Sequence, residues 1–429
     1  MALDDFGGWP GLLARLCDGE DLSADEAEAV LTEILGGEAE PAQIAGFLVG
    51  LKVKGETAEE TTGLVRAMVA VAEPLDLPEG TIDIVGTGGG HRRRVAALNV
   101  STMACFAAVG AGATVCKHGN RRASSTSGAF DLLEALGVDI EIAPDRLAVQ
   151  VAEHRIGFAF ARTFHPAMRF AGPIRAGLGI PTVFNVLGPL SHPGQPKRQV
   201  IGAADPALAD RMLEVFRIGG STHTWLVTGD DGLDEVALTG PTRILELRDG
   251  VASEWTLDPT DLGMTLAEAS DLAGGSPEAN AKIAHDLFAG RERGPRRDIV
   301  ALNAGAGLVV AGVADGIADG VERAIAALED GSAAAVLESI RACVVRGPWS
   351  ATGGTRRRRL SVEETGHQVG GARIRHGRCV GPPFGFHQDS VGQAVGQPAG
   401  PGGGGDGVEV ARQDERRHVA GHRPVDDVR

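Results

Sequence analysis

A glycine-rich turn is the first segment of this sequence that could bind an anion. DIVGTGGG, at residues 83–90, ends an apolar run and precedes Asn99, Ser101 and Thr102. Backbone N–H groups in such a turn, with hydroxyl groups at the start of a following helix, can hold a phosphate. The turn is neither a dinucleotide-binding G-x-G-x-x-G motif nor a Walker loop, because its third glycine is misplaced and no G-K-[ST] follows. A tight turn that binds nothing is the alternative.

A second segment, KHGNRRASSTSG at residues 117–128, gathers hydrogen-bond donors in what we expect to be one polar loop after a strand. A diphosphate together with a planar acid would satisfy so many donors. A surface loop with a glycine bend is the alternative. The donors of this segment are Lys117, His118, Asn120, Arg121, Ser124 and Ser125.

A third segment, GDDGLDEVALTG at residues 229–240, carries the adjacent carboxylates of Asp234 and Glu235. Such a pair could hold Mg²⁺ against a diphosphate. Neighbouring side chains of a strand point to opposite faces, so the pair could serve two metal ions only in a turn. Solvated loop acids are the alternative for this motif alone.

A fourth segment, at residues 164–190, is rich in proline and glycine and also apolar, which is typical of a hinge or a pocket wall. Arg175 within it could clamp a substrate carboxylate through two parallel hydrogen bonds. A surface ion pair is the alternative for this arginine.

The elements that must position these residues follow from hydrophobic periodicity and capping signals. Before about residue 72 the chain is expected to be all-helical, with Ser23 and Thr57 as helix N-caps. Beyond it, segments of helical and strand character alternate, which predicts a helical domain joined to an α/β domain. The expected helices are 101–112, 130–137, 277–290 and 297–312, and the expected strands are 113–120, 223–229 and 235–240.

Composition limits the classes of function. The chain has 429 residues and a formal net charge of −16, which argues against a nucleic-acid binder or a polybasic membrane protein. Its five cysteines form no C-x-x-C pair, and neither a signal peptide nor a membrane span is evident, so we expect a cytoplasmic protein. The slightly basic segment 346–429 has no sustained periodicity and is predicted to be a disordered or out-of-frame tail.

Taken in order, the motifs resemble those of the anthranilate phosphoribosyltransferases, which are nucleoside-phosphorylase-like enzymes. The resemblance covers roughly residues 10–340 and rests on FLVGLKVKGET, DIVGTGG, NVST, KHGNR, FHPAM, TVFNVLGPL, GDDGLDE and LNAGAGLVVAG. It implies a small helical domain (1–72, dimerisation) and a larger α/β catalytic domain (73–345) with a mixed, mostly parallel sheet. It further implies an Mg²⁺-dependent homodimer in tryptophan biosynthesis, which transfers the 5-phosphoribosyl group of phosphoribosyl pyrophosphate to the amine of anthranilate.

The same resemblance assigns site residues by motif position, and none of them as a nucleophile or as another catalytic group. The metal ligands would be Ser101, Asp234 and Glu235, and the contacts to anthranilate would be Gly86, His118, Asn120 and Arg175. The contacts to phosphoribosyl pyrophosphate would be Gly86, Gly89, Gly90, Asn99, Ser101, Thr102, Lys117, Ser124 and Ser125.

The glycine-rich turn at residues 83–90 and the loop after it depart from the family pattern. Gly90 stands where the family has an aspartate, the loop before Asn99 is longer, and it contains the arginines of residues 92–94. Arg162 also stands where a proline is common. The arginines either replace Mg²⁺-mediated contacts to the diphosphate or mark an impaired loop, and the second interpretation would make this chain an inactive homologue. Two further hypotheses are a pyrimidine-nucleoside phosphorylase-like enzyme and a nucleic-acid-binding relative of the fold.

Overall fold

The computed structural model describes residues 2–88, 98–121 and 126–345. Its first part is helical, as expected, and two N-caps of the predicted kind begin helices there. The Ser23 hydroxyl accepts a hydrogen bond from the Glu26 N–H, and Thr57 caps its helix through Glu60 in the same way. The helices are η1 (Leu3–Phe6), α1 (Gly8–Cys17), α2 (Ala24–Gly36), α3 (Pro41–Lys54) and α4 (Ala58–Ala70).

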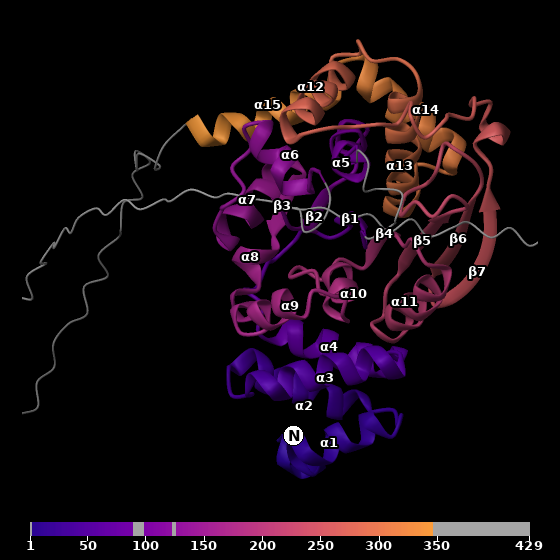
Figure 1. Ribbon diagram of the computed structural model, residues 1–429. Helices are drawn as coiled ribbons and strands as arrows, with labels where there is room; N and C mark the ends of the chain where they lie inside the picture. The colour runs from indigo at the N-terminus through magenta and orange to yellow at the C-terminus, as the bar shows by residue number, and fades with distance from the viewer. Residues whose placement is uncertain (1, 89–97, 122–125, 346–429) are drawn as a thin grey trace, which may run out of the picture. The chain divides into compact units, whose positions relative to one another are not determined.

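The second part is built on a seven-stranded sheet with the order β3-β2-β1-β4-β5-β6-β7 (Figure 1). The pairs from β3 to β5 are parallel, whereas β6 and β7 add as an antiparallel hairpin. The expectation of a mixed, mostly parallel sheet is therefore confirmed. The strands are β1 (Ile82–Gly86), β2 (Val115–Gly119), β3 (Ile156–Phe160), β4 (Arg198–Gly202), β5 (His223–Gly229), β6 (Thr242–Arg248) and β7 (Val251–Leu257).

Apolar layers cover both faces of the sheet because alternate strand residues point to opposite sides. Ile82 and Ile84 of β1 belong to the largest core cluster, while Val85 joins another with Ile201 of β4. The larger layer includes α5 (Val100–Gly110), α6 (Ala129–Ala135), α12 (Pro277–Phe288), α13 (Pro295–Ala311), α14 (Ile317–Glu329) and α15 (Ser332–Val345). The opposite side carries α7 (Pro144–His154) and α11 (Pro206–Ile218).

Short helices in the proline- and glycine-rich segment join the two parts. Ala171 and Phe184 from this segment are buried in the same core as the N-terminal helices. The ring of Phe170 lies so close to Gly37 that a Cβ there would be 2.6 Å from it. The segment thus packs as a wall against the helical part. Its helices are α8 (Ala161–Phe164), η3 (Pro166–Arg169), α9 (Gly172–Leu178) and α10 (Phe184–Leu190).

Two predictions about local structure are wrong. Residues 235–240 form no strand, and the backbone of Val236 pairs with a side chain of α13 instead of a neighbouring strand. The strand expected at 113–120 is confirmed as β2, so placing Lys117 and His118 in a loop after a strand is wrong, and their side chains point to opposite faces of the sheet. Among the described residues, no helix is long and apolar enough to cross a membrane.

Candidate active site

The carboxyl ends of β1 and β4 carry paired glycines that make room for Asp234. Gly86 and Gly202 are partners in the register of the two strands. A Cβ at Gly86 would collide with the Asp234 carboxylate, and one at Gly202 would collide with the Asp234 backbone carbonyl. Gly88 has φ +69° and donates its N–H to Oδ2 of Asp234 at 2.8 Å. Only glycines allow the acidic segment to lie this close to the edge of the sheet.

Asp234 and Glu235 are both buried, with 0% and 4% of their surfaces exposed. They lie in a bend, so the alternation of a strand, which would direct them to opposite faces, does not apply. No cluster of three or more His, Cys, Asp or Glu side chains suited to a metal occurs in the described part of the chain. Two carboxylates beside a glycine turn do fit Mg²⁺, which commonly takes one or two carboxylates and completes its shell with water and substrate phosphates.

Lys117 brings the start of α5 and the end of β1 together. Its side chain is buried, and Nζ donates to the Ile84 carbonyl and, at 3.3 Å, to the Ser101 hydroxyl. Ser101 is in the first turn of α5, where unpaired backbone N–H groups and the helix dipole favour an anion. Thr102 is in the same turn and is buried. The two predicted phosphate-binding segments therefore meet at one edge of the sheet.

Asn99 is the N-cap residue of α5, but its side chain forms hydrogen bonds with Ser127 and Asn280 and not with the N–H groups of the helix. Its Oδ1 accepts from the Ser127 hydroxyl at 2.9 Å and from Nδ2 of Asn280 at 2.8 Å. Its Nδ2 donates to the Ser127 carbonyl at 3.1 Å. Most of the hydrogen-bonding capacity of Asn99 is thus used within the protein, and its side chain fixes the start of α5 against the chain at Ser127.

Asp83 of β1 is a buried carboxyl group that sequence reasoning missed. No side chain among the described residues donates a hydrogen bond to it, and only the backbone N–H groups of Ile84 and His118 approach its oxygens. Burial raises the pKa of Asp83 to about 7, and the charge of Lys117 opposes that rise. The group is therefore partly protonated near neutral pH.

Three histidines cluster on the other face of β2. The ring of His118 lies 5.2 Å from that of His165 and 5.6 Å from that of His192, between centroids. Burial lowers the pKa of His118 well below its usual value, and it lowers the pKa values of His165 and His192 to about 4. Nδ1 of His118 lies 2.9 Å from the Gly188 carbonyl, so it carries the hydrogen and Nε2 is left with a lone pair. All three rings are neutral at pH 7.

Arg175 is a half-buried cation in α9. Its guanidinium lies 4.9 Å from the ring centroid of Phe184, and burial lowers the pKa of Arg175 below its usual value. In the described part of the chain it forms no ion pair, which argues against the surface ion pair considered from sequence. Phe184 and Gly188 both belong to α10, so this helix contacts Arg175 and His118 alike.

Asn120 and Arg121 follow β2 with different partners. Asn120 is exposed, and its Oδ1 accepts from the Arg121 N–H at 2.8 Å. The Arg121 guanidinium makes two hydrogen bonds to Glu134 of α6 and lies 5.2 Å from the Phe160 ring centroid. Arg121 therefore anchors this loop to α6. Gly89, Gly90, Ser124 and Ser125 lie outside the described residues.

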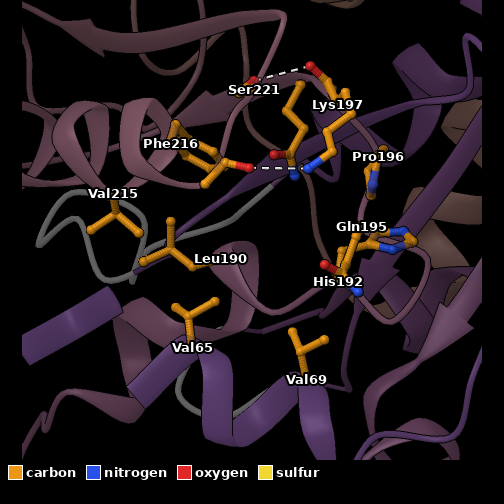
Figure 2. A pocket seen from close by; sticks show the side chains of 12 residues that line it. Val65, Val69, Leu190, His192, Gln195, Pro196, Lys197, Val215, Phe216 and Ser221 are labelled. Atoms are coloured by element: carbon orange, nitrogen blue, oxygen red, sulfur yellow. Dashed lines mark hydrogen bonds between the residues drawn. The ribbon is translucent and has the colours of Figure 1, made fainter. Parts of the chain in front are cut away.

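A cavity of about 90 Å³ between α4 and α11 is a separate feature (Figure 2). It is lined by Val65 of α4, Phe216 of α11, Gln199 near the start of β4, and Ser221 just before β5. It therefore lies at the amino ends of these strands, whereas Gly86 and Gly202 lie at the carboxyl ends of β1 and β4. Ligands of parallel α/β sheets bind at the carboxyl ends, so this cavity is not part of the candidate site.

The fold and the site define a class of glycosyl transferase. A model of the glycosyl transferase family α/β domain matches residues 79–334, and a model of its helical bundle domain matches residues 10–72. The chain is 47% identical to anthranilate phosphoribosyltransferase of Nocardioides sp. over 79% of this chain and 99% of that protein. It is 46% identical to that of Methylorubrum populi over 76% and 95%. The chain therefore belongs to the anthranilate phosphoribosyltransferase family.

Solved structures agree with this assignment. Anthranilate phosphoribosyltransferase from Thermus thermophilus is similar with a TM-score of 0.72 and 41% identity, over 77% of this chain and 98% of that chain. The Saccharomyces cerevisiae enzyme in complex with PRPP and Mg is similar with a TM-score of 0.71 and 28% identity, over 79% and 98%. Another structure of the yeast enzyme contains 4-fluoroanthranilate.

Proposed function

We propose that this chain transfers the 5-phosphoribosyl group of phosphoribosyl pyrophosphate to the amine of anthranilate, a step of tryptophan biosynthesis. The products are N-(5-phosphoribosyl)anthranilate and diphosphate. The observation that carries the proposal is the seating of Asp234 on Gly86 and Gly88 at the carboxyl edge of the sheet. It joins a glycine turn, which suits phosphates, to a buried carboxylate, which suits a metal ion.

Phosphoribosyl pyrophosphate would bind along this edge. Ser101 offers a hydroxyl group and a helix N-terminus, and Lys117 offers an ammonium group 3.3 Å from that hydroxyl. Positive charge at this point would stabilise the negative charge that develops on the departing diphosphate. Asn99 and Thr102 would act mainly by fixing the first turn of α5, because the Asn99 amide is engaged with Ser127 and Asn280 and Thr102 is buried.

Mg²⁺ would be held by Asp234 and Glu235, with Ser101 nearby, and would supply positive charge to the diphosphate when bound. Both carboxylates are buried, and that of Asp234 lies beside the glycine turn, which supports this part of the proposal. The yeast relative is described in complex with PRPP and Mg.

Anthranilate would bind on the side of α10. Arg175 would pair with its carboxylate, since a half-buried guanidinium without an acidic partner in the described part of the chain suits an incoming anion. Neutral His118, with a lone pair on Nε2, and Asn120 would receive hydrogens from the amine. An aromatic amine is already a nucleophile near neutral pH, so its alignment with C1 of the ribose is the main task of the protein.

We also propose that the chain forms a homodimer through the helical part, residues 1–72, and works in the cytoplasm, with residues 73–345 as the catalytic domain. Val49 and Val53 lie one turn apart on α3 and are both exposed, Val53 to 82%, and this apolar surface supports an interface there. Cys105 and Cys116 are free buried thiols, as in proteins of reducing compartments. Sedimentation of the wild type and of Val53→Glu would test the dimer, and a wild-type monomer would contradict it.

Product analysis tests the reaction itself. The purified chain, given Mg²⁺, phosphoribosyl pyrophosphate and anthranilate, is expected to form a product with the mass of N-(5-phosphoribosyl)anthranilate. Thymidine with phosphate serves as the parallel substrate pair. Release of thymine would instead support a pyrimidine-nucleoside phosphorylase. Absence of both reactions in a folded protein would indicate an inactive homologue.

A further inference from the structure

We infer that Asn303 of α13 is a positioning residue for the Asp234–Glu235 pair, an inference that rests on the proposed function. Asn303 is 1% exposed. Its Oδ1 accepts from the Val236 N–H at 2.9 Å, and its Nδ2 donates to the Val236 carbonyl at 2.9 Å. One side chain therefore pairs with both backbone groups of the residue that follows Glu235.

These bonds replace a missing strand partner. Residues 235–240 have no regular structure, yet Val236 is fully buried. A buried backbone N–H or carbonyl without a partner destabilises the fold. The amide of Asn303 satisfies both groups at once, as an adjacent strand would. It also donates to the Ile299 carbonyl at 2.9 Å, which fixes the orientation of the amide on its own helix.

The same helix also contacts the strand that carries the glycine turn. A Cβ at Gly307 would lie 2.6 Å from Cδ1 of Ile84 in β1, so the Ile84 side chain packs directly against the backbone of α13. Residues four apart in an α-helix lie on one face, which places Asn303 and Gly307 side by side. Helix α13 thereby sets the position of the acidic bend relative to the end of β1.

The bend is held from two sides as a result. Asp234 lies against Gly86 and Gly202, while Val236 is fixed by Asn303. Glu235 lies between these two fixed points. Without the Asn303 bonds, Asp234 and Glu235 would still be present, but their carboxylates could shift relative to the glycine turn. Loss of a residue that orients metal ligands typically weakens metal affinity about 10- to 100-fold.

The test measures metal dependence of binding and not only turnover. Binding of phosphoribosyl pyrophosphate to the full chain is titrated by calorimetry at a series of Mg²⁺ concentrations. Asn303→Leu removes both bonds to Val236, and Asn303→Ser is a milder variant whose hydroxyl is too short to reach both groups. Gln150→Leu is the matched control, because it removes a buried side-chain bond to the Ile156 carbonyl far from the acidic bend.

The expected result is a roughly 10- to 100-fold higher Mg²⁺ requirement in the folded Asn303 variants, with the control unchanged. The Michaelis constant for anthranilate at saturating Mg²⁺ should stay near the wild-type value, which general destabilisation would not predict. An unchanged Mg²⁺ requirement in Asn303→Ser, or an equal increase in Gln150→Leu, would overturn the inference alone. A wild-type chain that binds no phosphoribosyl pyrophosphate with Mg²⁺ would overturn the proposed function, and the inference with it.

Discussion

The carboxylate of Asp234 occupies the space that any side chain at Gly86 would need, although the two residues lie far apart in the sequence. The neighbouring N–H of Gly88 donates to the same carboxylate at 2.8 Å. This contact joins the glycine turn after β1 to the acidic bend. In the proposed reaction it would place the metal next to the phosphates.

Gly202→Ala should move the acidic bend at Asp234 away from the glycine turn after β1. The new methyl group would overlap the Asp234 carbonyl, so the acidic bend must move away from the sheet. A misplacement of about 1 Å can lower a rate about 100-fold, and we expect at least that loss in kcat/KM for phosphoribosyl pyrophosphate. Steady-state kinetics check this. Gly316→Ala is the control because its Cβ would meet no atom within 4 Å. Full activity of Gly202→Ala would show that the packing is irrelevant to the reaction.

Arg175→Ala should weaken anthranilate binding specifically. Removal of a charge-assisted hydrogen bond costs roughly 1.5–3 kcal/mol, so we expect the Michaelis constant for anthranilate to rise about 10- to 100-fold. Affinity for phosphoribosyl pyrophosphate should change little. The comparison variant is Arg169→Ala, an exposed arginine that also lies over a phenylalanine ring, 4.4 Å from the centroid. Equal effects of the two substitutions would count against a carboxylate clamp at Arg175.

Asp83→Asn should change the pH dependence of stability. The pKa of Asp83 is raised from about 3.9 in the unfolded chain to about 7 in the fold, so the native state binds more protons between these values. Wild-type stability therefore falls as pH rises through this window, on account of this group. Asparagine resembles the protonated carboxyl group, so the variant does not lose stability through ionisation of a buried group as pH rises.

Relative to the wild type, Asp83→Asn should gain about 2–3 kcal/mol of unfolding free energy between pH 5 and pH 8. Urea unfolding of both proteins at pH 5 and pH 8 measures this difference in unfolding free energy. The same difference between the two proteins at both pH values would mean that Asp83 does not titrate in this range.

Local signals account for what the sequence predicted well. The Ser23 and Thr57 caps depend on residues three positions away, and both form as expected. The β6–β7 hairpin also has a local signal, the Asp249-Gly250 turn with φ values of 50° and 81°, but it was not predicted. Apolar runs predicted β2 and β5 because buried strands are apolar on both faces, whereas β3 and β4 were not predicted.

Contacts between distant segments explain what the sequence did not reveal. The apolar letters after Glu235 resemble a strand, yet Asn303 supplies the backbone partners there, and no spacing rule connects residues 67 positions apart. Asp83 resembles any polar residue in a strand until its complete burial is known. Motif resemblance assigned roles to Lys117 and Asp234, but none to Gly202 or Asn303, which contact the acidic bend through packing and backbone hydrogen bonds.

The most direct measurement is the Mg²⁺-dependent loss of anthranilate fluorescence with phosphoribosyl pyrophosphate, on the wild type and on Asp234→Ala. The account predicts turnover by the wild type that disappears when Mg²⁺ is chelated and falls at least about 100-fold in Asp234→Ala. Turnover that survives in Asp234→Ala, or a folded wild type that consumes no anthranilate, would contradict it.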